Sequence, residues 1–277
     1  MLPLPVHSTD WRSYDRIAND YDRVWATRFE PVARALAGML PAGYAPIALL
    51  DIGTGTGIVP AIFAETLKTL HNITGCDVSL GMLQRAKRRL ASLRVVAADA
   101  AALPFQSQTF DLVTAGFVLS HLREYRRALN DAHRILKAAG LIAASNWTST
   151  VDEYSQAWSG CLAEAISKPE AERALNEVAP LENYFSQEGS LEAAFTESGF
   201  SVIHAAAVDL RLDLTVEQFV EDREINSGGR LGRHLLGKDK WIEFRERAVN
   251  ILRDRFGASI HYARRALIVI GQKSASR

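Results

Sequence analysis

The chain has 277 residues, and 48% of them are hydrophobic, which is enough for one large α/β core or for a core with a small cap. Lys and Arg together number 32, as do Asp and Glu, so a formal net charge of +0 gives no sign of a nucleic-acid or polyanion surface. Two cysteines are too few for a disulfide framework or a zinc site, which fits a reducing compartment.

The first residues lack the basic start and apolar run of a secretory signal. No apolar stretch approaches the roughly 20 residues that a bilayer-spanning helix needs. We therefore expect a cytoplasmic protein with no stable membrane insertion.

Residues 10–40 have helical spacing and one aromatic face. Tyr14, Ile17, Tyr21 and Trp25 recur at steps of three and four residues. By itself, this pattern is equally typical of ordinary core packing.

The strongest pattern is an apolar run at residues 47–52 that stops at an acid, Asp51, and three alternating glycines: Gly53, Gly55 and Gly57. The run predicts a buried parallel strand, and helical spacing follows it. At such a junction, glycine allows positive φ, and the unpaired N–H groups of the helix can hold a nucleotide-like ligand. The spacing differs from the dinucleotide pattern G-x-G-x-x-G because Ile58 occupies the last glycine position. A tight turn without a ligand is the alternative.

Acids also end the second and third predicted strands. Asp77 follows Gly53 by 24 residues, close to the roughly 20-residue offset of a ribose-binding acid in βαβ nucleotide sites. One carboxylate can accept hydrogen bonds from both ribose hydroxyls. The alternative for Asp77 is a helix N-cap. Asp99, with the backbone of Ala100, is placed to accept a hydrogen bond from an adenine amine, and a turn or cap is its alternative.

Residues 109–117 predict a buried fourth strand that widens at Gly116. The next residues bring His121 toward the mouth of the site, where it is a candidate general base, although a lone histidine is more often structural. Residues 141–145 predict a fifth strand. Strands thus alternate with helices, and the candidate contacts follow the strand ends, which is where open α/β sheets bind ligands.

These motifs resemble those of class I S-adenosylmethionine-dependent methyltransferases of the UbiE, small-molecule type. The matching strings are YDRIANDYD (14–22), LLDIGTGTG (49–57), DVSLGML (77–83), DAAALPF (99–105), FVLSHL (117–122) and RILKAAGLIAASNW (134–147). The last string departs from the family at Ala138 and Ala139, where Pro and Gly are common. The resemblance implies an α/β fold, with a Rossmann-like seven-stranded, mostly parallel sheet, helices on both faces, and helical inserts that cap the substrate pocket.

The resemblance also implies S-adenosylmethionine as the cofactor and no metal. The predicted cofactor-binding residues are Tyr14, Tyr21, Asp51, Gly53, Thr54, Gly55, Gly57, Asp77, Val78, Met82, Asp99, Ala100 and Gly116. The two tyrosines would lie on a leader that folds over cofactor and substrate. Met82 would line the adenine pocket, unless it fills the core. Asp51 would help to order the ammonium group of the cofactor.

We expect a single methyltransferase domain over residues 1–277. Its predicted parts are an N-terminal helical lid (1–45), a cofactor-binding core (46–147), a helical insert (148–190) and C-terminal strands (191–277) with a second helical insert (215–256). The pair Gly228-Gly229 predicts a hinge in the second insert.

The expected activity is methyl transfer to a small, partly apolar acceptor, by O- or C-methylation of a natural product, a quinone or a lipid-like molecule. The sulfonium already activates the methyl group, so a general base is needed only for a protonated, weak nucleophile. The alternatives are a non-catalytic S-adenosylmethionine-binding protein, and a protein or RNA methyltransferase, which neutral charge disfavours. We expect a small-molecule partner and no nucleic acid, and we leave a homodimer open.

Overall fold

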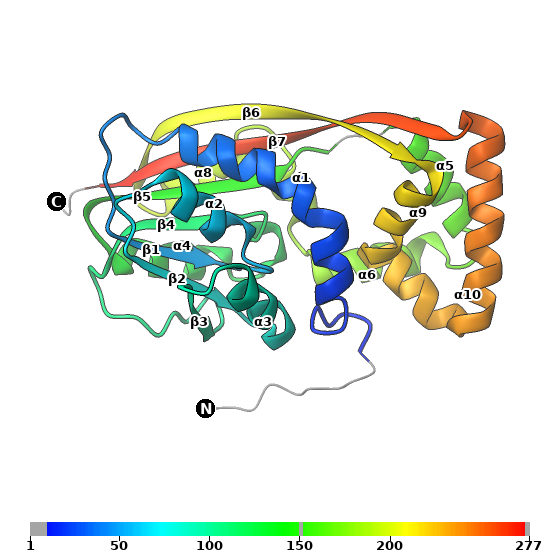
Figure 1. Cartoon of the computed structure of the whole chain (residues 1–277), viewed down its shortest axis with the longest axis horizontal. Helices are drawn as coiled ribbons and strands as arrows, with labels where there is room; N and C mark the ends of the chain where they lie inside the picture. The colour runs from blue at the N-terminus through cyan, green and yellow to red at the C-terminus, as the bar shows by residue number, and fades with distance from the viewer. Residues whose placement is uncertain (1–9, 150–151, 275–277) are drawn as a thin grey trace.

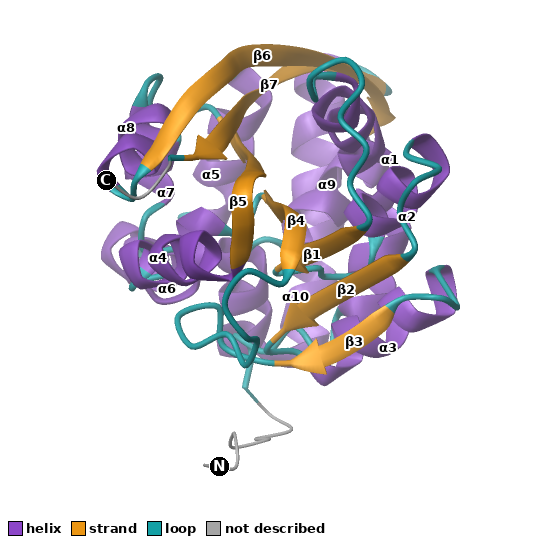
Figure 2. Cartoon of the chain, turned by 90° about the vertical axis from the view of Figure 1, so that its left-hand side faces the viewer, coloured by secondary structure: helices purple, strands orange, loops and turns teal. Residues whose placement is uncertain are grey.

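The fold is built on one seven-stranded sheet with strand order β3-β2-β1-β4-β5-β7-β6. The computed structural model describes residues 10–149 and 152–274. The strands are β1 (Ala48–Ile52), β2 (Asn72–Asp77), β3 (Arg94–Ala97), β4 (Phe110–Gly116), β5 (Leu136–Trp147), β6 (Phe200–Thr215) and β7 (Ser259–Lys273). β7 pairs antiparallel with both of its neighbours, and every other pairing is parallel, so the predicted mostly parallel, Rossmann-like sheet is confirmed (Figure 2).

The strands are apolar because both faces of the sheet are covered. In β1, Leu49 packs into the core on one face and Leu50 into the core on the other, as the two-residue period of a strand requires. β1 lies between β2 and β4, with Asp51 level with Gly75 and Thr114. The carboxyl ends of the central strands therefore meet at one edge of the sheet, where the glycine turn begins.

Helices cover both faces of the sheet. One face carries α1 (Ala18–Gly38), α2 (Ile58–Thr66) and α3 (Leu80–Arg89). The other carries α4 (Tyr125–Ile135), α7 (Glu182–Phe185) and α8 (Ser190–Glu197), and a short 3-10 helix, η1 (Leu119–His121), follows β4. Within the described part of the chain, no helix is long and apolar enough to cross a membrane.

A helical cap lies beyond the sheet. It consists of α5 (Glu153–Leu162), α6 (Lys168–Val178), α9 (Val216–Ile225) and α10 (Ser227–Phe256), packed around the far ends of β6 and β7. Figure 1 shows the two long strands running from the sheet to this cap, with the start of α1 between cap and sheet. Trp158 of α5 is buried in the cap core, where it packs against Phe244 at 5.7 Å between ring centroids. The cap helices lie within residues 153–178 and 216–256.

Two details differ from the sequence expectations. The predicted hinge at Gly228-Gly229 is wrong, because both glycines lie in the first turn of α10. Gly229 instead allows close packing, since a Cβ there would lie 2.2 Å from the carbonyl oxygen of Arg223. The chain breaks at Asn226, between α9 and α10, and kinks at Gly237, where φ is 72°. The N-terminal helix begins at Ala18, which leaves Tyr14 in the preceding turn.

Candidate functional site

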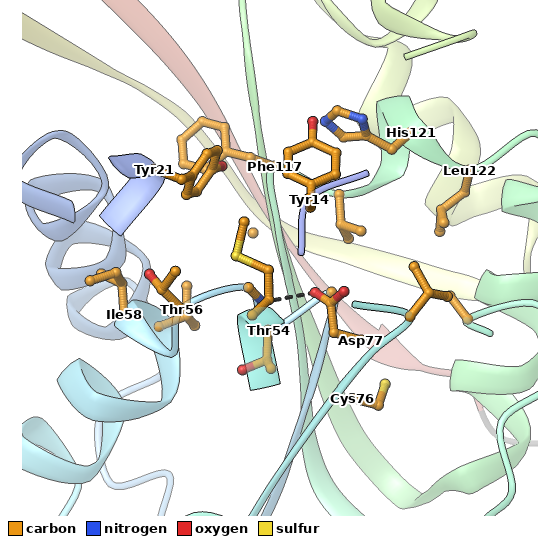
Figure 3. A pocket seen from close by; sticks show the side chains of 18 of the residues that line it. Tyr14, Tyr21, Thr54, Thr56, Ile58, Cys76, Asp77, Phe117, His121 and Leu122 are labelled. Carbon is orange, nitrogen blue, oxygen red and sulfur yellow. Dashed lines mark hydrogen bonds between the residues drawn. The ribbon is translucent and has the colours of Figure 1, made fainter. Parts of the chain in front are cut away.

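A cavity of about 290 Å³ opens at the carboxyl ends of β1, β2 and β4. Its floor is the glycine turn, and its roof comes from the leader before α1 and from η1 (Figure 3). The structure brings together eleven of the predicted cofactor residues and the candidate base: Tyr14, Tyr21, Gly53, Thr54, Gly55, Asp77, Val78, Met82, Asp99, Ala100, Gly116 and His121. Asp51 and Gly57 do not line the cavity.

The glycine turn needs its glycines for two separate reasons. Gly53, Gly55 and Gly57 all have positive φ, at 64°, 51° and 83°, which side chains rarely adopt. A Cβ on Gly53 would also lie 2.2 Å from Cγ2 of Val118, whereas a Cβ on Gly55 would meet nothing closer than 3.9 Å. The space beside Gly55 is therefore open, and a ligand can lie against the backbone there.

Asp77 is held by two backbone donors. Its Oδ2 accepts from the Gly55 N–H at 2.9 Å, and its Oδ1 accepts from the Ser79 N–H at 2.9 Å. These bonds fix the carboxylate at the cavity wall, and each oxygen keeps a lone pair for a further donor. Burial raises the pKa of Asp77. The N-cap of α3 is Ser79, whose hydroxyl accepts from the Met82 N–H at 3.1 Å, so the cap alternative for Asp77 is excluded.

Asp99 and Met82 show how a structural role and a place in the cavity can coincide. Asp99 is exposed and lines the cavity, and its Oδ1 accepts from the Ala101 N–H at 2.8 Å to form the turn that was its alternative. Its other oxygen is available to a ligand. Met82 is 2% exposed and so contributes to the core while it lines the cavity. Asp99 therefore forms a turn and also lines the cavity, and Met82 belongs to the core and also lines the cavity.

Asp51 and Gly57 lie behind the cavity lining. Asp51 Oδ1 accepts from the Thr114 hydroxyl at 2.7 Å, and burial raises the Asp51 pKa to about 7. Its Oδ2 is buried without a hydrogen-bond partner among the described residues. Gly57 is the N-cap of α2, and a Cβ there would lie 2.8 Å from the Cα of Ala86. Gly57 therefore lets α2 approach α3, whereas Asp51 places an unpaired acceptor under the turn.

The roof of the cavity is aromatic. Tyr14 makes edge contacts with Tyr21, at 5.9 Å between centroids, and with His121, at 6.1 Å. The guanidinium of Arg230, from α10, lies 4.6 Å from the centroid of the Tyr14 ring. Arg230 of the cap thus packs against Tyr14, which covers the cavity.

His121 has a defined tautomer when it is neutral. Its Nδ1 lies 2.8 Å from the carbonyl oxygen of Val178, and because a carbonyl can only accept, Nδ1 carries the proton. Nε2 then has the free lone pair that a base requires. Burial lowers the pKa of His121, so the neutral form prevails at pH 7.

Two contacts that the sequence did not reveal attach the leader to α3. Asp15 Oδ1 accepts from the Ser79 hydroxyl and from the Gly81 N–H, both at 2.7 Å. Asp22 pairs with Arg85 at 2.5 Å and also with Arg89. The acids of the YDRIANDYD string were a usable signal, but their partners lie more than 60 residues away.

The sequence also missed part of the cavity wall. Its other lining residues are Phe29, Thr56, Ile58, Val59, Cys76, Ala98, Phe117, Val118, Leu122 and Val178. Phe117 stacks on Trp147 at 4.4 Å and meets Phe29 at 4.9 Å, which makes one wall aromatic. Among the described residues, no group of three or more His, Cys, Asp or Glu side chains could hold a metal ion.

Comparison with known proteins gives one family match. Residues 50–144 match a family model described as a methyltransferase domain. A malonyl-[acyl-carrier protein] O-methyltransferase from Marinomonas sp. is 33% identical over 54% of this chain and 56% of its own length. A demethylmenaquinone methyltransferase from Thermotoga maritima is 34% identical over 47% of this chain and 57% of its own length. The matches thus span only a little over half of these relatives.

A solved structure shares the fold over nearly all of this chain. It is phospholethanolamine N-methyltransferase 2 from Haemonchus contortus, in complex with phosphomonomethylethanolamine and S-adenosylhomocysteine. Its TM-score is 0.58 at 16% identity, and the match covers 99% of this chain and 62% of that one. At this identity, the likeness establishes the fold alone.

Proposed function

We propose that this chain is a class I methyltransferase that transfers a methyl group from S-adenosylmethionine to a small, partly apolar acceptor. The methyltransferase-domain match over residues 50–144 and the two methyltransferase relatives support this proposal and the resemblance predicted from sequence. One observation carries the proposed activity: the cavity joins the glycine turn and Asp77 to an aromatic roof and wall. The reaction is argued from this site, because one fold supports many functions.

The residues of the cavity fit the cofactor. The open space beside Gly55 admits a ligand against the backbone, and the start of α2 offers N–H groups to its amino-acid part. Asp77 has lone pairs for the two ribose hydroxyls, and Asp99 has one for the adenine amine. The unpaired Oδ2 of Asp51, under the turn, suits an ammonium group reached through water.

The walls favour a small acceptor with an apolar part. Phe117 and Phe29 line the cavity, and Trp147 stacks on Phe117. Tyr14, against which Arg230 of the cap packs, roofs the cavity, which favours a small molecule over a protein or RNA chain. We propose O- or C-methylation of a natural product, a quinone or a lipid-like molecule.

The chain's own residues would mainly orient the acceptor and exclude water from the cavity. Bound S-adenosylmethionine supplies a methyl group that its sulfonium already activates. Tyr14 and Tyr21 cover the cavity, and the Phe117 wall holds the acceptor in line, which removes much of the entropic cost of the reaction. Where the nucleophile is a hydroxyl, Nε2 of His121 would accept its proton.

Substituting His121 with alanine should lower turnover by about 10²–10⁴-fold, the usual contribution of a general base. Because the pKa of His121 lies below its ordinary value of 6.5, the base stays neutral at pH 7 and above. The wild-type rate should therefore be flat from neutral pH upward and fall only as acid protonates the imidazole. Initial rates across pH would test this, and S-adenosylhomocysteine affinity should barely change.

His133→Ala is the matched control for this substitution. His133 lies on α4 against Phe200, outside the cavity, and should leave the rate and the pH profile unchanged. Equal rates for His121→Ala and wild type would return His121 to a structural role.

A binding test and a transfer test would examine the proposed function. S-adenosylhomocysteine should raise the melting temperature of the protein, and NAD should not, because the turn lacks a dinucleotide spacing. Methyl-labelled cofactor should then label a low-molecular-mass fraction of a cell extract. Cofactor binding without any labelled acceptor would favour the non-catalytic alternative, and label in protein or RNA would refute the small-molecule assignment.

A further inference from the structure

The strand β6 forms one edge of the sheet along its whole length. It pairs with β7 on one side, and no described strand pairs with its other side. Figures 1 and 2 show β6 along the upper margin of the fold. The strand has 16 residues, so its outer side presents a long row of backbone N–H and C=O groups that a further strand can bind.

The usual protections of an exposed edge are missing from most of β6. Such edges commonly carry lysine, proline or a β-bulge, which hinder pairing with another chain. The strand contains neither lysine nor proline, and its register with β7 shifts between Val202 and His204, near its start. Residues 205–215 therefore form an edge without a bulge, and main-chain hydrogen bonds can add a second strand there.

The charged side chains of this segment alternate in sign on one face of the strand. Asp209, Arg211 and Asp213 follow each other at two-residue steps, and all three are exposed. Asp209 pairs with Arg265 of β7, and Asp213 contacts the ring of His261. Arg211 forms no hydrogen bond or salt bridge with a described residue. Its guanidinium is therefore available to an acid on a partner.

The segment is complementary to a second copy of itself. When two β6 strands run antiparallel with Leu210 opposite its own copy, Asp209 of each chain lies directly opposite Arg211 of the other. Both of these cross-strand pairs join opposite charges, which stabilises strand pairing. On the other face, Val208 lies opposite Leu212, and both are half-buried in the single chain. Pairing would cover more of their apolar surface.

Registers centred one or two residues further along the strand fit less well. The first places Asp209 opposite Asp213, and Arg211 opposite its own copy, so like charges meet. The second joins Arg211 to Asp213 but pairs only residues 209–215, because β6 ends there. The Leu210-centred register combines opposite charges with the full length of the bulge-free segment.

We propose that two copies of this chain form a dimer through β6, by antiparallel pairing of residues 205–215 around a two-fold axis at Leu210. The contact uses the same segment of both chains, so it closes at two copies. Pairing of β6 with the opposite edge of the sheet would instead build open chains, but that edge, β3, has only 4 residues. The dimer does not depend on the proposed methyl transfer, because the described lining of the cofactor cavity includes no residue of β6.

Two charge-reversed variants test both the dimer and its register. In Asp209→Arg, and likewise in Arg211→Asp, every charged pair across the axis joins like charges, so each variant alone should be a monomer. An equimolar mixture of the two variants restores opposite charges in both pairs and should form a dimer. Size-exclusion chromatography with light scattering would give the masses, and wild type should have twice the 30.5 kDa of one chain.

Asp213→Arg is the matched control. It makes the same change of charge on the same face, but Asp213 lies opposite Ala207 in the proposed register, so this variant should remain a dimer. Amide hydrogen exchange examines the strand itself, and residues 205–215 should exchange more slowly in wild type than in Arg211→Asp. If Asp209→Arg does not fold, the loss of the dimer in Arg211→Asp and its retention in Asp213→Arg still decide the register.

Three results would overturn the proposal: a monomeric wild type, a monomeric Asp213→Arg, or folded charge-reversed variants that stay monomeric when mixed. A mass that rises beyond two copies with concentration would contradict a closed contact. Calorimetry with S-adenosylhomocysteine separates this inference from the proposed function, because the monomeric variants should bind it as wild type does. Loss of that binding in wild type would refute the proposed function and leave the dimer result intact.

Discussion

Substituting Asp77 with alanine should weaken S-adenosylhomocysteine binding by about 1.5–3 kcal/mol, the scale for losing hydrogen bonds to a charged group. That is roughly a 10- to 150-fold rise in Kd. The Asp77 carboxylate is aimed at the cavity by the Gly55 and Ser79 N–H groups, so it needs no rearrangement to accept the ribose hydroxyls. Isothermal titration calorimetry at constant pH would measure the change.

Two variants make the Asp77 measurement specific. Asp77→Asn keeps the shape of the side chain and one acceptor oxygen, so its loss of affinity should be smaller. Asp209→Ala removes an exposed acid on β6 that pairs with Arg265, and its affinity should equal that of wild type. Unchanged binding in Asp77→Ala would rule out the ribose assignment. A large fall in its melting temperature would show that the lost backbone bonds matter for the fold as well.

Substituting Asp222 with alanine should lower the free energy of unfolding by about 3–5 kcal/mol, because it leaves the charge of Arg28 buried and unpaired. Asp222 on α9 is 0% exposed, and the side chain of Arg28 on α1 is 6% exposed. This ion pair joins α1 to α9 of the cap. Urea unfolding at neutral pH would give the change, with equal slopes required for a direct comparison.

A double variant and a neighbouring residue provide the controls. Arg28→Met combined with Asp222→Leu removes both charges and should recover most of the loss, since apolar pairs often replace buried ion pairs at little cost. Glu221→Ala breaks a 2.5 Å pair with Arg23 whose side chains are 33% and 55% exposed, and should cost less than about 1 kcal/mol. A cost for Asp222→Ala no greater than that for Glu221→Ala would contradict a buried role for the pair.

The sheet was predictable because its signals are local. Each central strand is a short apolar run with a turn signal beside it, and burial on both faces leaves few other structures for such a run. The cap was predictable only as helices. Its break at Asn226 and its kink at Gly237 depend on how α9 and α10 meet, so the pair Gly228-Gly229 was a misleading signal.

The floor of the cofactor cavity was predictable for the same reason. The glycine turn, Asp77 and Asp99 follow directly from strand ends, whose neighbours in the sheet bring them together. The roof and the wall were harder to predict. Phe29 lies within a helix whose aromatic spacing is equally typical of core packing, and Val178 is the last residue of α6, in an insert with no motif.

The sequence by itself determined an α/β sheet with a nucleotide-type turn at Gly53–Gly57, because strand, turn and helix patterns depend on residues a few positions apart. The tertiary structure alone decided which side chains meet across the cap. Arg28 and Asp222 are 194 residues apart, and the contact between Arg264 and Trp147 joins two different strands. No local pattern encodes such pairs, because they exist only once distant parts of the chain are packed together.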